Sequence, residues 1–92
     1  MTRESNPADE AIISQWAAHW SRTRQLAAAL ARELAALPDH SRIEPATKTA
    51  DRHGVSYTVA LSARNLLIGA KLAYKRGAHC YKAATTRNGT GR

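Results

Sequence analysis

The sequence predicts an α+β domain in which one long N-terminal α-helix packs on a three- to four-stranded antiparallel β-meander. Two observations predict this class. In the first half, apolar residues recur at spacings of three, four and seven, which is helical periodicity. In the second half, apolar and small or polar residues alternate, which is typical of half-buried strands. The 92 residues suit a single small domain, and a hydrophobic content of 43% is too high for a disordered chain.

The helix is expected over residues 7–37. Asn6 is a suitable N-cap, Pro7 fits the first helical position, and Pro38 ends the helix. A straight helix of this length would measure ~46 Å, whereas a four-stranded sheet is only ~19 Å wide. One helix would therefore overhang the sheet unless it breaks.

Two outcomes stay open for this overhang. A break between Ser21 and Thr23 would allow Trp16 and Trp20 to pack in the core. Without a break, the same two tryptophans would project as an anchor for a partner chain or for a homodimer through the N-terminal helix.

The meander is expected over residues 42–84, and residues 7–84 form the single domain. A turn at Arg64 and Asn65 would join strands over 55–63 and 66–74, so that all cross-strand pairs on one face are apolar. A second turn at Gly77 and Ala78 would place Tyr74 opposite Tyr81, with glycine where a type II′ turn requires it.

The two ends of the meander are less regular. A weaker strand around 43–49 would lie at the edge, because Pro45 cannot donate a hydrogen bond inside a sheet. An alternative makes residues 66–76 a helix that is capped by Gly77. Residues 1–6 are expected to form an N-terminal extension, and residues 85–92 a flexible basic tail.

The positive charge is concentrated in one half of the chain. Residues 1–46 carry five basic and six acidic residues, whereas residues 47–92 carry nine basic residues and a single acid, Asp51. The two halves therefore have charges of −1 and +8. Such asymmetry is typical of a surface that binds nucleic acid or another polyanion, although a solvated face would look similar.

These bases predict a non-enzymatic protein that contacts the phosphate backbone of a duplex or of structured RNA. The predicted sheet places lysines and small residues on the face opposite the helix, and places Tyr57, Tyr74 and Tyr81 on the buried face. Without exposed aromatic residues, single-strand binding by stacking is disfavoured. The expected polyanion-binding residues are Lys48, Lys71, Lys75, Lys82, Arg64, Arg76 and Arg87.

Two other functions fit the same sequence. The first is a small accessory or inhibitor protein, of the type made by phages and mobile elements, that binds an acidic surface of a larger protein machine through Trp16 and Trp20. The second is a small basic ribonuclease toxin, with His53 or His79 as general acid or base.

Neither a metal nor a cofactor is expected. The four histidines form no ligand pair, and Cys80 is the single cysteine. No apolar run approaches the ~18 residues that a membrane span needs, and no signal peptide is visible, so a cytoplasmic location without membrane contact is expected.

Overall fold

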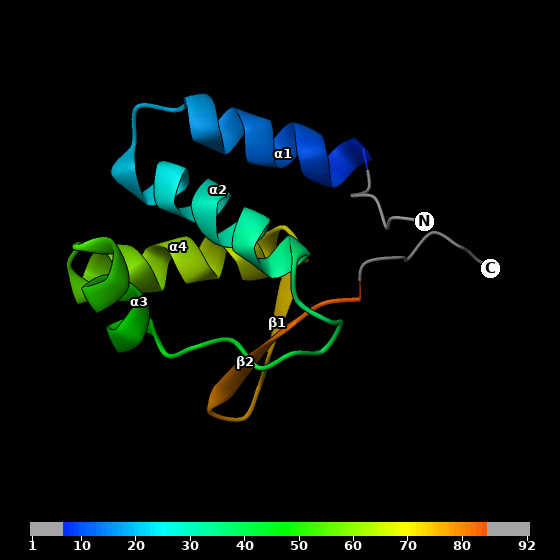
Figure 1. The fold of residues 1–92 in the computed structure, drawn as a ribbon. Coiled ribbons are helices and arrows are strands. Elements are labelled where there is room, and N and C mark those ends of the chain that lie inside the picture. The colour runs from blue at the N-terminus through cyan, green and yellow to red at the C-terminus, as the bar shows by residue number, and fades with distance from the viewer. Residues whose placement is uncertain (1–6, 85–92) are drawn as a thin grey trace.

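The computed structural model describes residues 7–84, which form four helices followed by a two-stranded antiparallel hairpin (Figure 1). The elements are α1 (Pro7–Ala18), α2 (Arg22–Ala35), α3 (Ala46–His53), α4 (Tyr57–Gly69), β1 (Ala73–Arg76) and β2 (His79–Lys82). The fold is α+β in general, but the prediction of one long helix on a three- to four-stranded meander is wrong. The expected extension at 1–6 and tail at 85–92 lie outside the described residues.

The predicted helix over 7–37 is broken, as one of the two alternatives for this segment required, but only Trp16 of its two tryptophans packs in the core. α1 ends at Ala18, and Ser21 caps α2 by accepting a hydrogen bond from the backbone N–H of Arg24 at 3.4 Å. The break lets α1 fold back along α2 (Figure 1), so that Ile13 and Trp16 are buried in the core that they share with α2.

The segment predicted as a strand pair around Arg64 and Asn65 is the helix α4. The Ser56 hydroxyl accepts a hydrogen bond from the N–H of Val59 at 3.1 Å and so caps its first turn. The fully buried residues of α4 are Ala60, Ala63 and Leu67, whose spacings of three and four place them on one helical face. Because nearly every second residue here is small or apolar, the sequence satisfies both periods. Packing against α2 selects the helical one.

The predicted edge strand over 43–49 is also wrong. Arg42 forms a single bridge with Tyr81, after which Pro45 precedes the first turn of α3. Proline suits this position because it precedes the helix, where its missing N–H removes no hydrogen bond within α3. α3 then buries Ala46 and Ala50 against Ala60 of α4.

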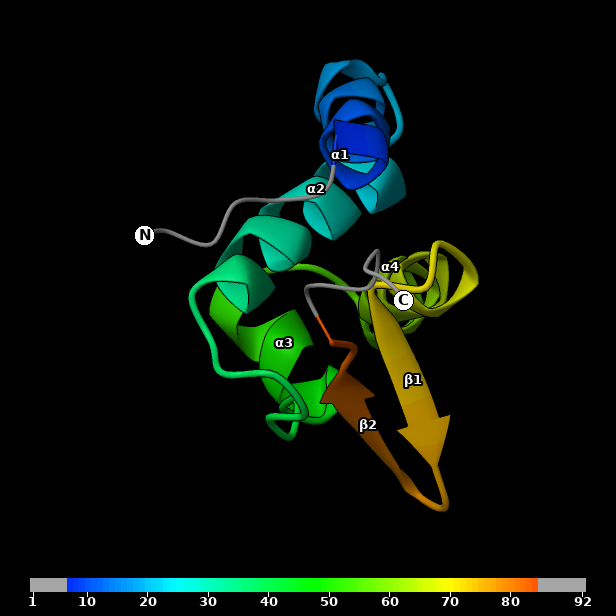
Figure 2. The same ribbon diagram turned by 90° about the vertical axis from the view of Figure 1, so that its right-hand side faces the viewer.

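The hairpin β1–β2 confirms the predicted turn and register. Gly77 has φ +62°, and Tyr74 lies opposite Tyr81. The two tyrosine rings stack with centroids 5.6 Å apart. Figure 2 shows the hairpin extending away from the layer of helices, with β2 on the side of α3. The alternative helix over 66–76 is wrong, because α4 ends at Gly69 and β1 begins at Ala73.

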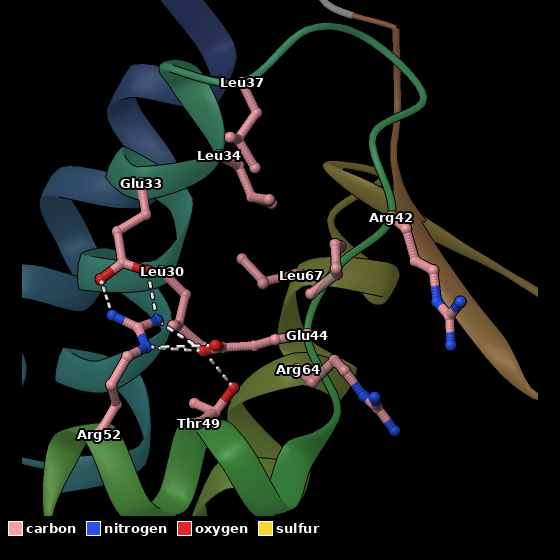
Figure 3. A pocket seen from close by; sticks show the side chains of 11 residues that line it. Leu30, Glu33, Leu34, Leu37, Arg42, Glu44, Thr49, Arg52, Arg64 and Leu67 are labelled. Carbon is pink, nitrogen blue, oxygen red and sulfur yellow. Dashed lines mark hydrogen bonds and ion pairs between the residues drawn. The ribbon is translucent and has the colours of Figure 1, made fainter.

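An ion-pair network joins α2, α3 and the segment between them (Figure 3). The guanidinium group of Arg52 lies 2.7 Å from the Glu33 carboxylate and 2.6 Å from that of Glu44. The Thr49 hydroxyl also donates a hydrogen bond to the Glu44 carboxylate, at 2.9 Å. One base from α3 therefore holds two acids that belong to different elements.

This network predicts a loss of stability in acid. The hydrogen bond from Arg52, supported by that from Thr49, holds the pKa of Glu44 below its ordinary value of 4.5. A depressed pKa in the folded state contributes stability above pH 4.5, and that contribution is lost as the pH falls through the folded-state pKa. Urea denaturation at about pH 6 and about pH 3 should therefore show a smaller acid-induced loss in Glu44→Gln than in the unmodified protein. The exposed Asp51→Asn is the control; an equal effect of both substitutions would contradict the prediction.

Candidate nucleic-acid interface

Helices α3 and α4 form a helix-turn-helix unit. They are joined by Gly54, Val55 and Ser56, and Gly54 adopts the left-handed conformation with φ +65°. The backbone N–H groups of Gly54 and Val55 both bond to the carbonyl of Ala50, which ends α3 and turns the chain sharply into α4. A short turn that contains glycine between two packed helices is the arrangement by which such units present their second helix to DNA.

The outer face of α4 carries short polar side chains. Thr58, Ser62 and Asn65 follow one another at spacings of four and three residues, so they form a single stripe. This stripe lies opposite the buried face of α4; Thr58 and Asn65 are exposed, and Ser62 is half-buried. Hydroxyl and amide groups both donate and accept hydrogen bonds, as the edges of base pairs require. The strands predicted over 55–74 did not point to these residues as a site, although Gly54 followed by the N-cap Ser56 was the available signal for a helix here.

The basic residues divide into neutralised and unneutralised sets. Arg52 is paired with Glu33 and Glu44, and Arg32 lies 3.1 Å from Glu10. Within residues 7–84, five of the bases predicted to bind a polyanion make no ion pair: Lys48, Arg64, Lys71, Lys75 and Arg76. All are exposed except the half-buried Arg64, and they belong to α3, α4, the connection to β1, and β1. They do not share one sheet face, because the predicted sheet does not exist.

Lys82 is a correction to the predicted interface. Its side chain is buried, with 5% exposure of the residue, and the ammonium group donates a hydrogen bond to the carbonyl of Leu37. The same group lies 3.8 Å from Asp39. Lys82 thus fastens β2 to the chain after α2 instead of facing solvent. Arg87, another predicted contact, lies outside the described residues.

The aromatic residues are also placed differently from expectation. Tyr57 stands at the start of α4 and is 51% exposed, not buried under a sheet. Trp16 is part of the core, whereas Trp20, in the connection between α1 and α2, is 87% exposed and stacks on His19. The two tryptophans therefore do not form the joint partner anchor that the sequence suggested.

The histidines considered for ribonuclease chemistry do not come together. His53 Nε2 lies 3.5 Å from a carboxylate oxygen of Glu33, on the side of α2. His79 belongs to the hairpin, where its Nδ1 is 2.9 Å from Arg42 Nη2. The two rings thus lie on different parts of the fold, near Glu33 and near Arg42, and the pair is not placed to act on one scissile bond as acid and base.

Residues 7–84 contain no group of three or more histidine, cysteine, aspartate or glutamate residues placed to hold a metal ion. None of their helices combines the length and the apolar character needed to cross a membrane.

Comparison with known proteins gives one structural similarity. No family model matches the chain, and no curated protein matches it. Among solved structures, the chain is similar to the crystal structure of a GntR-family transcriptional regulator, with a TM-score of 0.66 and 26% sequence identity. The match covers 74% of this chain and 28% of that one. The chain therefore spans little more than a quarter of the regulator. This similarity gives no support to an acidic protein partner, a homodimer, a phage-type inhibitor or a ribonuclease.

Proposed function

We propose that this chain binds double-stranded DNA, with α4 in the major groove and the hairpin β1–β2 against the neighbouring backbone. The observation that carries the proposal is the polar stripe on α4, formed by Thr58, Ser62 and Asn65 and accompanied by bases that no acid neutralises among residues 7–84. The description of the structural neighbour as a transcriptional regulator supports DNA as the nucleic acid.

The shape of the unit favours DNA over duplex RNA. The major groove of B-DNA is ~12 Å wide and admits an α-helix, whose diameter with side chains is ~10–12 Å. The major groove of A-form RNA is deep and narrow and excludes a helix. Side chains as short as those of Thr58 and Ser62 reach base edges only when the helix itself enters the groove.

The polar side chains of α4 and the basic side chains make different kinds of contact with DNA. Asn65 can make the bidentate contact to adenine through its amide, and the two hydroxyls can bond to either a donor or an acceptor on a base. Lys48, Lys71, Lys75 and Arg76 supply positive charge for phosphate oxygens, which positions the protein but carries no sequence information.

The test is selection of bound sequences from a random duplex library, followed by Asn65→Ala. We expect the selected sequence to lose about 5- to 150-fold in affinity with this variant, because a good bidentate base contact is worth about 1–3 kcal/mol. Affinity for unrelated duplex should not change, since the phosphate contacts remain. Gln15→Ala, on the exposed side of α1, is the control and should alter neither affinity. Failure to enrich any sequence, or the same preference in Asn65→Ala, would refute base reading by α4.

A further inference from the structure

A cationic cleft lies beside the polar stripe of α4. It has a volume of about 240 Å³ and is bounded by the starts of α3 and α4 and by β2. The polar side chains that line it are those of Arg42, Thr47, Tyr57, Arg64 and His79. Within the described part of the chain, no carboxylate lines this cleft and neither arginine forms an ion pair. The cleft therefore gathers positive charge that no acid of the described residues balances.

The first arginine is oriented by a neighbour. Arg42 donates a hydrogen bond from Nη2 to Nδ1 of His79 at 2.9 Å, which commits one end of its guanidinium group to β2. Figure 3 shows that the Arg42 and Arg64 side chains extend toward the same region, away from the leucines that converge on the adjacent apolar cavity. The remaining donors of Arg42 are therefore available beside those of Arg64.

The second arginine lies in the same cleft. Nε of Arg64 is buried and has no hydrogen-bond acceptor among the described residues. Because a covered Nε cannot meet a ligand, only the Nη groups of Arg64 can donate to one in the cleft. A guanidinium group makes charge-assisted hydrogen bonds to phosphate or carboxylate oxygens, and no carboxylate of the described residues supplies them here. Arg64 and Arg42 together therefore favour an oxyanion in the cleft.

The start of α3 adds further donors. Pro45 precedes the helix and supplies no side-chain cap. The N–H groups of Lys48 and Thr49 bond to the carbonyl of Pro45, whereas those of Ala46 and Thr47 precede the first possible helical acceptor. Both of these residues line the cleft, where the positive end of the helix dipole favours an anion.

We propose that this cleft binds one phosphate group, held by the Nη donors of Arg64 and by the remaining donors of Arg42, with the start of α3 facing it. The inference rests on the proposed function in one respect: on DNA, the group is a backbone phosphodiester next to the bases that α4 reads. A free phosphate monoester has the same chemistry and is the other source. A phosphate seated between α3, α4 and β2 fixes the register of the helix-turn-helix unit on the duplex.

Phosphate binding in the cleft is tested first without DNA, with inorganic phosphate as the probe. Nitrogen-15 NMR of the folded protein should show a saturable shift of the Arg64 Nε–Hε resonance as phosphate is added. Sodium chloride at matched ionic strength should not reproduce the shift. Arg42→Ala should abolish or strongly weaken it, and Arg24→Ala, an exposed arginine on α2, should leave it unchanged. No shift, or the same shift with chloride, would contradict phosphate binding in the cleft, even if the protein binds DNA.

The second arm identifies the source of the phosphate. If the cleft holds a backbone phosphodiester, Arg42→Ala should make the slope of log affinity for duplex DNA against log salt shallower by about 0.9. This is the contribution of one phosphate contact. A phosphate-induced shift with an unchanged slope would overturn the DNA role and support a free phosphate monoester. A phosphate-induced shift in a protein that binds no duplex would refute the proposed function and still support phosphate binding in the cleft.

Discussion

Replacing Lys75 and Arg76 together by alanine is expected to weaken the binding of duplex DNA about 60-fold at about 0.1 M salt. Each phosphate contact releases condensed counterions and contributes about 0.9 to the slope of log affinity against log salt. At about 0.1 M salt, this amounts to about 0.9 decades of affinity per contact, and thus about 1.8 decades for two. Both residues lie exposed on β1, where no acid neutralises them among the described residues.

Fluorescence anisotropy over a series of salt concentrations measures both quantities. The matched control is Arg22→Ala with Arg24→Ala, which removes the same charge from exposed positions at the start of α2. We expect this control to keep the original slope, since α2 does not take part in the proposed interface. Equal losses in the two double variants would mean that net charge alone attracts DNA, and that the hairpin makes no defined contact.

Replacing Leu67 by alanine is expected to destabilise the fold by about 3 kcal/mol, because Leu→Ala in a core removes apolar contacts and leaves a cavity. Leu67 is 1% exposed and belongs to the main core cluster, in which α4 packs with α1 and α2. For a small domain with a free energy of unfolding of about 5–15 kcal/mol, this is a large fraction of the total.

Urea denaturation followed by circular dichroism measures this loss. Leu37→Ala is the control, because the same deletion at a position with 39% exposure removes far less buried contact. We expect the control to lose under about 1 kcal/mol. A similar midpoint for both variants would show that the packing of α4 on α2 does not depend on Leu67.

Part of the candidate interface was predictable from the sequence. The charge asymmetry directed attention to Lys48, Arg64, Lys75 and Arg76, which the structure leaves without acidic partners among its described residues. Lys82 belongs to the same basic run, yet its ammonium group is buried against Leu37. Sequence position does not reveal such a contact, because the two residues are 45 positions apart and meet only after the hairpin docks.

The polar stripe on α4 was missed for a related reason. Thr58, Ser62 and Asn65 acquire a common direction only if their segment is helical, and a strand would scatter them over two faces or into a turn. The helical or extended state of 55–69 therefore decided which residues could form a site at all.

Local chemistry alone determined the hairpin turn at Gly77 and the register that pairs Tyr74 with Tyr81, because a two-residue turn leaves the strands a single register. It also allowed the break at Ser21, a good N-cap in the middle of an apolar stripe. The state of residues 55–69 was decided only in the tertiary structure. Their alternating small and apolar residues suit a strand, while their three- and four-residue spacings suit a helix. The free energy gained by burying Ala63 and Leu67 against α2, and Ala60 against α3, is available only to the helix once these neighbours are in place.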